Sequence, residues 1–307
     1  MPGIVPERPN ERLNERVLVA GGTGYLGSRL VPRLVATGRP VRVLVHGGAR
    51  VPAGADSAQG DLTDPASLAR ALAGVHTVYH LVGIIREEGR STFRAVHVDG
   101  TRALVDAARA AGARRFLYVS AIGARPDAPT AYWRTKAEAE SIVRASGLDW
   151  IVLRPSIVFA PDGEIFKVLA QLTAFPLVPV LGPGRARLAP IRADDLADVE
   201  VKALDRPAAW NRVHEAAGPE AMEFNDLLRR VAHARGRRVA LVHVPLALAK
   251  PLVAALSKAL GRLSPITPDQ LAMLSEDSVA DPLALAREFG VEPRSIQPLL
   301  EGRERAA

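Results

Sequence analysis

Short apolar runs rich in Val and Ile alternate with Ala- and Arg-rich stretches along the first half of the chain. The runs predict strands, and the stretches place apolar residues at helical spacing and predict helices. Regular alternation of the two is typical of βαβ units around a parallel sheet. The expected strands are 16–20, 41–46, 77–81, 116–120, 150–153 and 212–216, and the expected helices are 25–37, 65–72, 94–111 and 131–146.

The pattern changes after Pro155, where prolines crowd the segment 161–190 and the remaining chain is mostly helical in pattern. We therefore expect a doubly wound α/β lobe followed by a smaller, mostly helical C-terminal lobe. The expected division is a tail over 1–14, a first lobe over 15–160 that is rejoined by 188–217, a second lobe over 161–187 and 218–300, and a tail over 301–307.

Composition narrows the class of protein. The 307 residues are 48% hydrophobic and 24% charged, as in globular proteins, and the absence of cysteine excludes disulfides and zinc–thiolate sites. No stretch resembles a signal peptide or spans a bilayer, so we expect a cytoplasmic location. We also expect no metal site. The net charge is +7, but only His233 to Arg238 forms a basic cluster and it lacks interleaved aromatics, so nucleic-acid binding is not expected.

The stretch "VLVAGGTGYLGSRL" joins the first expected strand to the first expected helix. Its glycines fit two registers, G-x-G-x-x-G from Gly22 and G-x-x-G-x-x-G from Gly21, and both registers share Gly24 and Gly27. Glycines there let the backbone approach a pyrophosphate, which the positive end of the helix attracts. The context predicts dinucleotide binding, with Gly22 serving only the turn.

The end of the second expected strand, "VRVLVHGGAR", bears on the choice of nucleotide. His46 stands where NAD-binding proteins carry a carboxylate for the ribose, and Arg50 follows. The sequence offers no anion here to repel a 2′-phosphate and two groups to attract one. We expect NADP(H) to be preferred, with NAD(H) and a merely solvated Arg50 as the alternatives.

Two more strand ends are expected at the nucleotide. In "QGDLTD" Asp61 is expected to accept a hydrogen bond from the adenine amino group, and Asp64 to cap the helix that begins at Pro65. In "YHLVG" Gly83 ends a strand where the backbone must pass close to a cofactor.

The segment "AYWRTKAEAE" places Tyr132 and Lys136 four residues apart, on one face of a helix. An unperturbed tyrosine has a pKa of about 10, too high for proton exchange at neutral pH. A neighbouring ammonium favours the phenolate, so we expect Lys136 to lower the pKa of Tyr132 and fit it for acid/base chemistry.

The ordered motifs "GGTGYLG", "GDLTD", "HLVG", "YVSAIGA", "YWRTK" and "LRPSIVF" resemble the extended and atypical short-chain dehydrogenase/reductases. The stretches "FRAVHVDGTRALVDAARAAGARRFLYVSAIGA" and "APIRADDLAD" through "GPEAMEFNDLLRRVAHA" are similar to the branch that includes complex I alpha subcomplex subunit nine. The resemblance covers residues 16–298. It implies a Rossmann-type lobe that binds NADP(H), with the C-terminal lobe closing over the nicotinamide.

The resemblance also implies roles for individual residues. Tyr132 is the acid/base, Lys136 holds the nicotinamide ribose, Pro155 lies beside the nicotinamide, and Ser120 best matches the serine that polarises a substrate carbonyl. The residues expected at the cofactor are Gly21, Thr23, Gly24, Tyr25, Leu26, Gly27, His46, Arg50, Asp61, Leu62, Leu81, Val82, Gly83, Lys136 and Pro155.

Three positions depart from the family pattern. Active members usually carry Ser or Thr where this chain has Ala121, an asparagine of the proton relay is replaced by His97, and Ala160 replaces a glycine. Ser120 then has the alternative role of a strand-end residue, and His97 that of a structural histidine.

Three functions remain open. The first is an oxidoreductase that transfers hydride to or from a small carbonyl, enone or quinone-like substrate, as a monomer or homodimer. The second is a non-catalytic NADPH-binding structural or assembly protein, favoured by Ala121 and His97. The third is a nucleotide-sugar epimerase or dehydratase, disfavoured because such enzymes usually prefer NAD.

The stretch 242–265 is apolar and carries Lys250, Lys258 and Arg262. It allows an amphipathic helix on the inner face of the plasma membrane, consistent with a quinone-like substrate, although Pro251 is expected to break a single long helix. The alternative is an ordinary helix packed within the second lobe.

Overall fold

The structure, a computed structural model, describes residues 15–260 and 266–303. Its centre is a seven-stranded parallel sheet with the order β11-β6-β5-β4-β1-β2-β3. The strands are β1 (Arg16–Ala20), β2 (Val41–Val45), β3 (Asp56–Gln59), β4 (Val75–His80), β5 (Arg115–Val119), β6 (Asp149–Pro155) and β11 (Arg212–Ala216). The predicted Rossmann-type fold is confirmed, and the strand order reverses between β1 and β4, where such sheets open a ligand crevice.

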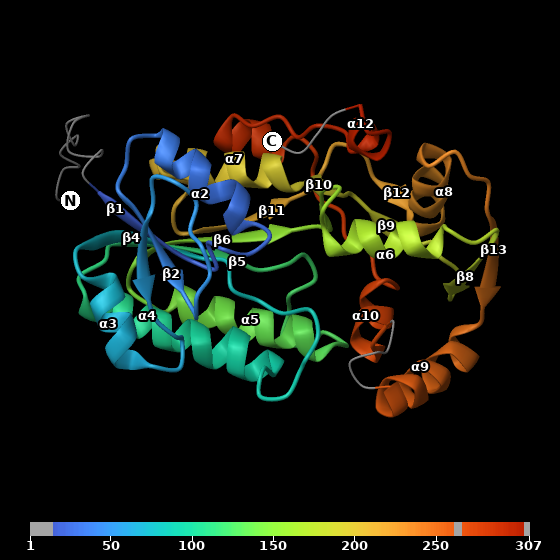
Figure 1. The fold of residues 1–307 in the computed structure, drawn as a ribbon, viewed down its shortest axis with the longest axis horizontal. Helices are drawn as coiled ribbons and strands as arrows, with labels where there is room; N and C mark the ends of the chain where they lie inside the picture. Colours follow the sequence, from blue (N-terminus) through green and yellow to red (C-terminus); the bar gives the residue numbers. More distant parts are fainter. Residues whose placement is uncertain (1–14, 261–265, 304–307) are drawn as a thin grey trace.

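Helices cover both faces of this sheet (Figure 1). One face carries α3 (Pro65–Leu72), α4 (Gly100–Ala110) and α5 (Ala131–Arg144), and the other carries α2 (Gly27–Ala36), α7 (Ala193–Ala203) and α11 (Ala284–Phe289). Two apolar clusters fill the layers between sheet and helices. The helix expected over 94–111 begins with a turn of π-helix, η1 (Arg94–Asp99), before α4.

The chain beyond β6 builds a second set of elements at one end of the molecule (Figure 1). Some of its helices pack around a third apolar cluster and others around a smaller one. Three short two-stranded sheets, which the sequence did not predict, join distant segments. The pairs are β7 (Val158–Phe159) with β10 (Ile191–Arg192), β8 (Leu177–Leu181) with β13 (Ala240–Val244), and β9 (Arg187–Leu188) with β12 (Met222–Glu223). The helices of this set are α6 (Glu164–Leu172), α8 (Phe224–Ala234), α9 (Leu246–Leu260), α10 (Pro268–Met273) and α12 (Gln297–Leu300). The short η2 (Pro207–Ala209) precedes β11 and packs in the first cluster through Ala209.

The apolar stretch 242–265 corrects one expectation. Its first residues belong to β13, and α9 continues through Pro251, so the expected break at that proline is wrong. A proline removes a single amide donor from a helix, and α9 accommodates that loss at an exposed position. No helix in the described part of the chain has the length and apolarity needed to cross a membrane.

Some sequence-based expectations fall outside the described residues. They are the tail over 1–14, residues 304–307 of the C-terminal tail, and Arg262 of the proposed basic edge. The division of the chain into two lobes stays a prediction.

Candidate active site

The glycine loop between β1 and α2 is built for close backbone contact. Gly21 has a φ of +87°, and a Cβ on Gly27 would lie 2.3 Å from the Gly21 carbonyl oxygen and 2.4 Å from the Gly22 Cα. Gly22 does more than serve the turn, because a Cβ there would lie 2.7 Å from a methyl group of Val43 in β2. The loop therefore needs glycine at three positions: at Gly21 for its positive φ, and at Gly22 and Gly27 because a Cβ would collide with a neighbour.

The start of α2 offers unpaired donors. Among the described residues, no hydrogen bond is found for the backbone amides of Tyr25, Leu26 and Gly27, while Thr23 and Gly24 are exposed. Free amides at a helix N-terminus are suited to an anion such as a pyrophosphate. The loop thus fits the phosphates of a dinucleotide.

Tyr25 closes the far side of this loop. The Arg29 guanidinium lies 4.7 Å from its ring centroid, and the phenol oxygen is buried with no hydrogen-bond partner among the described residues. Burial raises the pKa of Tyr25 well above its usual range. A Cβ on Gly163, at the start of α6, would lie 2.7 Å from that oxygen, so the second set of elements reaches the phosphate loop here.

The end of β2 corrects the expectation that no anion lies there. Asp61 Oδ2 is 3.0 Å from His46 Nδ1, and its Oδ1 accepts hydrogen bonds from the amide and hydroxyl of Thr63. These donors hold the pKa of Asp61 below its ordinary value. A pocket of about 240 Å³ is lined by His46, Asp61 and also Arg70, a cation that sequence reasoning missed because α3 brings it in from another element.

Other predicted cofactor residues also have definite places. Asp64 caps α3 as expected by accepting from the Ala66 amide at 3.0 Å, and Arg50 is exposed. Leu62 contacts α4, since a Cβ on Gly100 would lie 3.0 Å from its Cδ1. Leu81 and Val82 follow the end of β4, and Pro155 is the last residue of β6. The Leu81 amide donates to the Ala20 carbonyl, and the Pro155 carbonyl accepts from the Ile122 amide.

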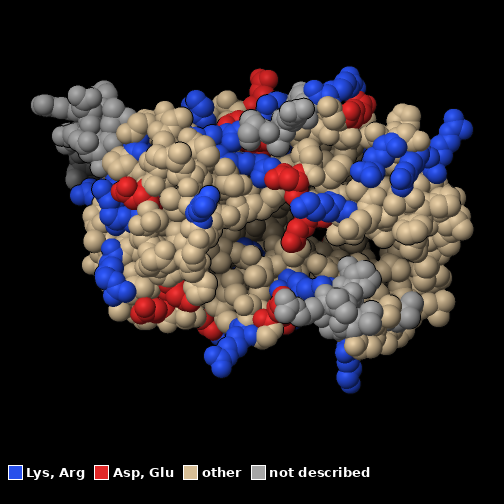
Figure 2. All heavy atoms as spheres, in the orientation of Figure 1, with Lys and Arg blue, Asp and Glu red and all other residues tan. Residues whose placement is uncertain are grey.

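Tyr132 and Lys136 lie at the end of the sheet where Gly83 follows β4. Lys136 Nζ donates to the Val119 carbonyl at 2.9 Å, and a Cβ on Gly83 would lie 3.1 Å from the same nitrogen. The chain therefore passes over the lysine at a residue with no side chain, and the expected approach of Gly83 to a cofactor stays a prediction. Figure 2 shows the surface hollowed between the sheet and the second set of elements.

The ionisation of this pair differs from the expectation. Burial raises the pKa of Tyr132 to about 12, and burial lowers the pKa of Lys136 to about 7. The predicted lowering of the tyrosine pKa is therefore wrong for the protein by itself. The physical reason is that burial penalises the charged form of each group, so both favour their neutral forms.

His97 sits in η1 and contacts Tyr132, with 5.4 Å between the ring centroids. Its Nε2 accepts a hydrogen bond from the Ile84 amide at 3.1 Å, and its Nδ1 lies 3.0 Å from the Thr135 hydroxyl. Burial lowers the pKa of His97 to about 2. The ring is thus neutral and fully engaged, which favours the structural alternative over a proton relay.

Ser120 is tied to a carboxylate that sequence reasoning missed. Its hydroxyl donates to Glu140 Oε1 at 2.6 Å, and Arg154 binds both oxygens of Glu140 at 2.8 and 2.7 Å. Ser120 and Glu140 are both buried. The spacing of Glu140 four residues after Lys136, on the same face of α5, was the only signal in the sequence.

The second set of elements covers the tyrosine. Met273 of α10 packs against a buried cluster that includes Phe93, Tyr132 and Trp133. Nearby, Arg125 forms two hydrogen bonds of 3.0 Å with Glu276. These contacts keep bulk water away from one side of the crevice.

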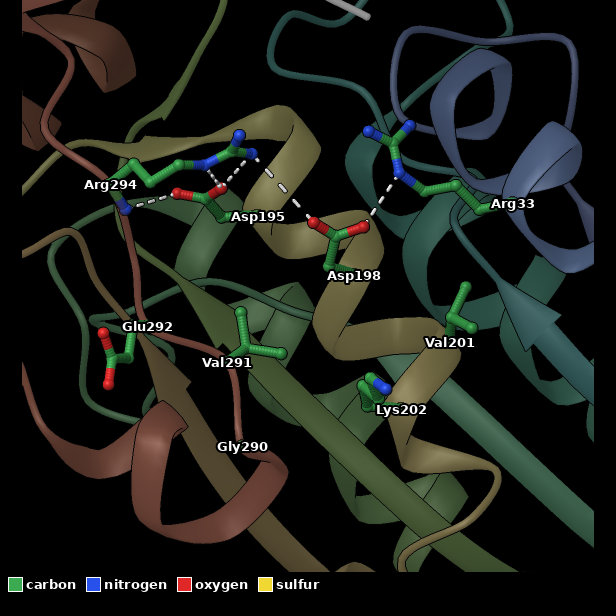
Figure 3. Close-up of a pocket in the computed structure, with 9 residues that line it drawn as sticks. All are labelled: Arg33, Asp195, Asp198, Val201, Lys202, Gly290, Val291, Glu292 and Arg294. Atoms are coloured by element: carbon green, nitrogen blue, oxygen red, sulfur yellow. Dashed lines mark hydrogen bonds and ion pairs between the residues drawn. The ribbon is translucent and has the colours of Figure 1, made fainter.

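A second pocket, of about 320 Å³, lies on the other face of the sheet, between α2, α7 and the chain after α11. Figure 3 shows its acidic side chains on α7 facing arginines from both neighbours: Arg33 Nε is 2.9 Å from Asp198, and Arg294 Nε is 2.7 Å from Asp195. The pocket holds no general acid or base apart from these ion-paired groups and the exposed Lys202 and Glu292. These ion pairs hold α2 and the chain after α11 against α7.

Comparison with known proteins identifies the family of the chain. The NAD(P)H-binding family matches residues 21–207. The NAD(P)H azoreductase of Xenophilus azovorans is 30% identical over 238 residues, covering 76% of this chain and 79% of the relative. The mitochondrial NADH-ubiquinone oxidoreductase 40 kDa subunit of Neurospora crassa is 25% identical over 296 residues, covering 91% and 76%.

Solved structures share the fold. The UDP-glucose 4-epimerase of Thermus thermophilus, in complex with NAD, superposes with a TM-score of 0.70 at 24% identity, covering 93% of this chain and 96% of that one. An identity this low shows the fold alone, whereas the family match extends over more than half of the chain. The chain therefore belongs to the NAD(P)H-binding family, and its similarity to an NAD(P)H azoreductase places it among the NAD(P)-dependent oxidoreductases.

Proposed function

We propose that the protein reduces a small carbonyl or quinone-like substrate with NADPH, using Tyr132 as proton donor and Lys136 as its partner. The observation that carries this proposal is the position of Lys136 Nζ, beside Gly83 and 2.9 Å from the Val119 carbonyl, at the ends of β4 and β5. Those strand ends open onto the same crevice as the glycine loop.

The ionisation of the pair favours reduction. NADPH supplies the hydride when bound. Tyr132 keeps its proton at neutral pH because its pKa is about 12, so the phenol is ready to donate that proton to the substrate oxygen as hydride reaches the carbon. Lys136, with a pKa of about 7, exchanges protons readily near neutrality and would hold the ribose by hydrogen bonds from Nζ. Ser120 acts indirectly, because its hydroxyl donates to Glu140.

The preference for NADP(H) is part of the proposal. His46, Arg70 and the exposed Arg50 supply basic groups near the end of β2, where a 2′-phosphate would bind. The Asp61 carboxylate opposes a phosphate less than its charge suggests, because both of its oxygens already face donors. The second lobe, over 161–187 and 218–300, closes on the nicotinamide end through contacts such as Met273 on the tyrosine cluster.

Replacement of the acid tests the chemistry. We expect Tyr132→Phe to lower kcat for NADPH-dependent quinone reduction by about 10²- to 10⁴-fold, because the proton donor is lost. NADPH affinity should change little. The matched control is Tyr79→Phe, whose hydroxyl binds the Glu200 backbone carbonyl inside the core, away from the crevice. Equal turnover in wild type and Tyr132→Phe would overturn the assignment.

Cofactor binding is tested separately. The nucleotide that copurifies is released and identified, and NADPH or NADH is then added while the melting temperature is followed. We expect a larger rise with NADPH, and Arg70→Ala should reduce the difference between the two. A larger rise with NADH would contradict the NADP(H) preference, and a rise with neither would contradict the site.

A second candidate is a non-catalytic NADPH-binding subunit of a larger assembly. It is favoured by the Ser120 hydroxyl, whose proton is held by Glu140 and is therefore not offered to a substrate. The relative from Neurospora crassa is named as a subunit of NADH-ubiquinone oxidoreductase, which gives this candidate a precedent. It predicts tight NADPH binding and a biological role that survives Tyr132→Phe.

A further inference from the structure

The end of the molecule farthest from the seven-stranded sheet exposes large apolar side chains. They are Phe175 (68% exposed), Leu177 (62%), Val242 (48%), Leu248 (65%) and Leu256 (37%), which we call the apolar strip. They lie before or in β8, in β13 and in α9, which are neighbours at this end (Figure 1). Scattered single apolar residues are ordinary on a protein surface, but five on adjoining elements call for an explanation.

The pairing of β8 with β13 explains why the strip faces outward. Leu177 pairs with Ala240 and Pro179 with Val242, so these residues share one face of a two-stranded sheet. The residues between them in β8, Val178 and Val180, are buried against the third core cluster. The sheet therefore buries one apolar face and leaves the other uncovered.

Helix α9 continues the same arrangement. Ala249 and Val253 are buried against Leu271 of α10, whereas Leu248 and Leu256 are exposed. The helix is thus packed on one side only, and its free side is also apolar.

The charge around the strip is one-sided. The chain carries no Asp or Glu over 165–193 or over 227–268, the segments that hold β8, β13 and α9. The second segment holds eight cationic residues: Arg229, Arg230, Arg235, Arg237, Arg238, Lys250, Lys258 and Arg262. Arg229 and Arg230 are ion-paired with Asp226 and Glu220, so the basic turn at 235–238 carries the argument. Arg237 donates to the Ala174 carbonyl at 2.7 Å, which fixes the basic turn after α8 beside Phe175. Figure 2 shows basic side chains gathered over α8, next to a broad uncharged surface.

We propose that this end of the protein rests on an anionic lipid bilayer. The apolar strip would enter the headgroup region, and the basic turn at Arg235, Arg237 and Arg238 would meet the lipid phosphates. A second copy of the chain fits less well, because two such cationic surfaces would repel each other. The proposal is independent of whether the crevice turns over a substrate.

Flotation with lipid vesicles tests the proposal. We expect the full chain to float with vesicles made of equal amounts of phosphatidylcholine and phosphatidylglycerol, to stay behind with phosphatidylcholine alone, and to be released by salt. The double variant Arg235→Glu, Arg238→Glu should bind the mixed vesicles at least about tenfold more weakly, given the attraction of each basic residue to an anionic leaflet. Leu248→Gln should bind about fivefold more weakly, because less apolar surface enters the membrane.

Matched controls lie elsewhere on the molecule. The double variant Arg102→Glu, Arg114→Glu changes the net charge equally at two exposed positions of the first lobe, and Leu283→Gln alters a leucine that is 62% exposed. Both should bind vesicles as the wild type does. The proposal is overturned if the wild type does not float with mixed vesicles at low salt, or if the control variants bind as weakly as the strip variants. It is also overturned if the protein sediments as a dimer that Leu248→Gln dissociates, since a second copy would then cover the strip.

Discussion

The crevice and the apolar strip differ in which kind of side chain is buried and which is exposed. In the crevice, charged groups are buried and have partners: Lys136 donates to Val119, and Glu140 binds Arg154 and Ser120. At the strip, apolar side chains such as Leu177 and Leu248 face solvent. Removal of one partner of a buried charge pair lowers the stability of the fold strongly, whereas exposed apolar groups contribute little to folding. The crevice is therefore held by its own contacts, and the strip is left available for a surface outside the chain.

The largest difference between the two regions is expected when a carboxylate is removed. Glu140→Ala leaves the Arg154 guanidinium and the Ser120 hydroxyl without their acceptor, so the free energy of unfolding should fall by about 3 kcal/mol. Asp226→Ala breaks an exposed ion pair with Arg229 on α8, near the strip, and should cost less than about 0.5 kcal/mol. Urea unfolding of both variants measures the difference.

Equal losses of unfolding free energy in Glu140→Ala and Asp226→Ala would contradict the comparison. The buried and the exposed ion pair would then contribute equally to stability. Glu140→Gln is a useful intermediate. It keeps the shape and one acceptor oxygen, so it should lose less stability than Glu140→Ala.

A buried carboxylate without a partner gives the next largest effect. Glu200 of α7 is fully buried, neither carboxylate oxygen has a partner among the described residues, and burial raises its pKa to about 8. A raised acid pKa means that the folded state holds a proton which the unfolded state releases above about pH 4.5. Its stabilising contribution is complete below that pH and is lost as pH rises through about 8.

Glu200→Gln removes this titration. The stability of the variant relative to wild type should therefore increase by about 1 kcal/mol per pH unit between pH 5.5 and 7.5. Urea unfolding at several pH values measures the difference. Subtracting the wild type at each pH cancels the histidines and Lys136, which also titrate with shifted pKa values. A difference that does not change with pH would show that Glu200 is not protonated in the folded protein.

The sequence predicts the sheet well because the apolar residues of a strand themselves indicate that the strand is buried. The inner strands of the central sheet, such as β1 and β5, are covered on both faces, so they read as apolar runs. The edge strand over 212–216 was also predicted, although it carries polar residues. The pair β8 and β13 was missed because it is covered on one face only and β8 contains Pro179, a residue typical of loops or edge strands.

In the candidate site, features that depend on one segment were predicted, and features that join two elements were missed. Gly21, Gly27 and Gly83 were found because glycine at a close backbone approach is visible in the sequence itself. The pairing of Asp61 with His46 and that of Glu140 with Ser120 were missed, because each joins residues from different elements. The pKa of Tyr132 was misjudged for a related reason, since burial depends on the whole fold.

A smaller effect is expected at the glycine loop. Gly27→Ala would place a Cβ 2.3 Å from the Gly21 carbonyl oxygen, so the loop must shift. We expect a loss of stability of about 1 to 3 kcal/mol and about tenfold weaker NADPH binding. Gly48→Ala is the control, because nothing lies within 4 Å of its Cβ position. Unchanged NADPH affinity in Gly27→Ala, measured by calorimetry, would remove the loop from the binding site.

The smallest effect on stability is expected at the strip, and its smallness is informative. Leu248→Gln replaces a side chain that is 65% exposed by another good helix former, so the free energy of unfolding should change by less than about 0.5 kcal/mol. Val253→Ala, on the buried side of the same helix, should cost about 1.5 kcal/mol because two methyl groups leave the contact with α10. Thermal unfolding of both variants without lipid measures the contrast. If Leu248→Gln costs as much as Val253→Ala, Leu248 belongs to the core of the lobe and is not free to meet a membrane.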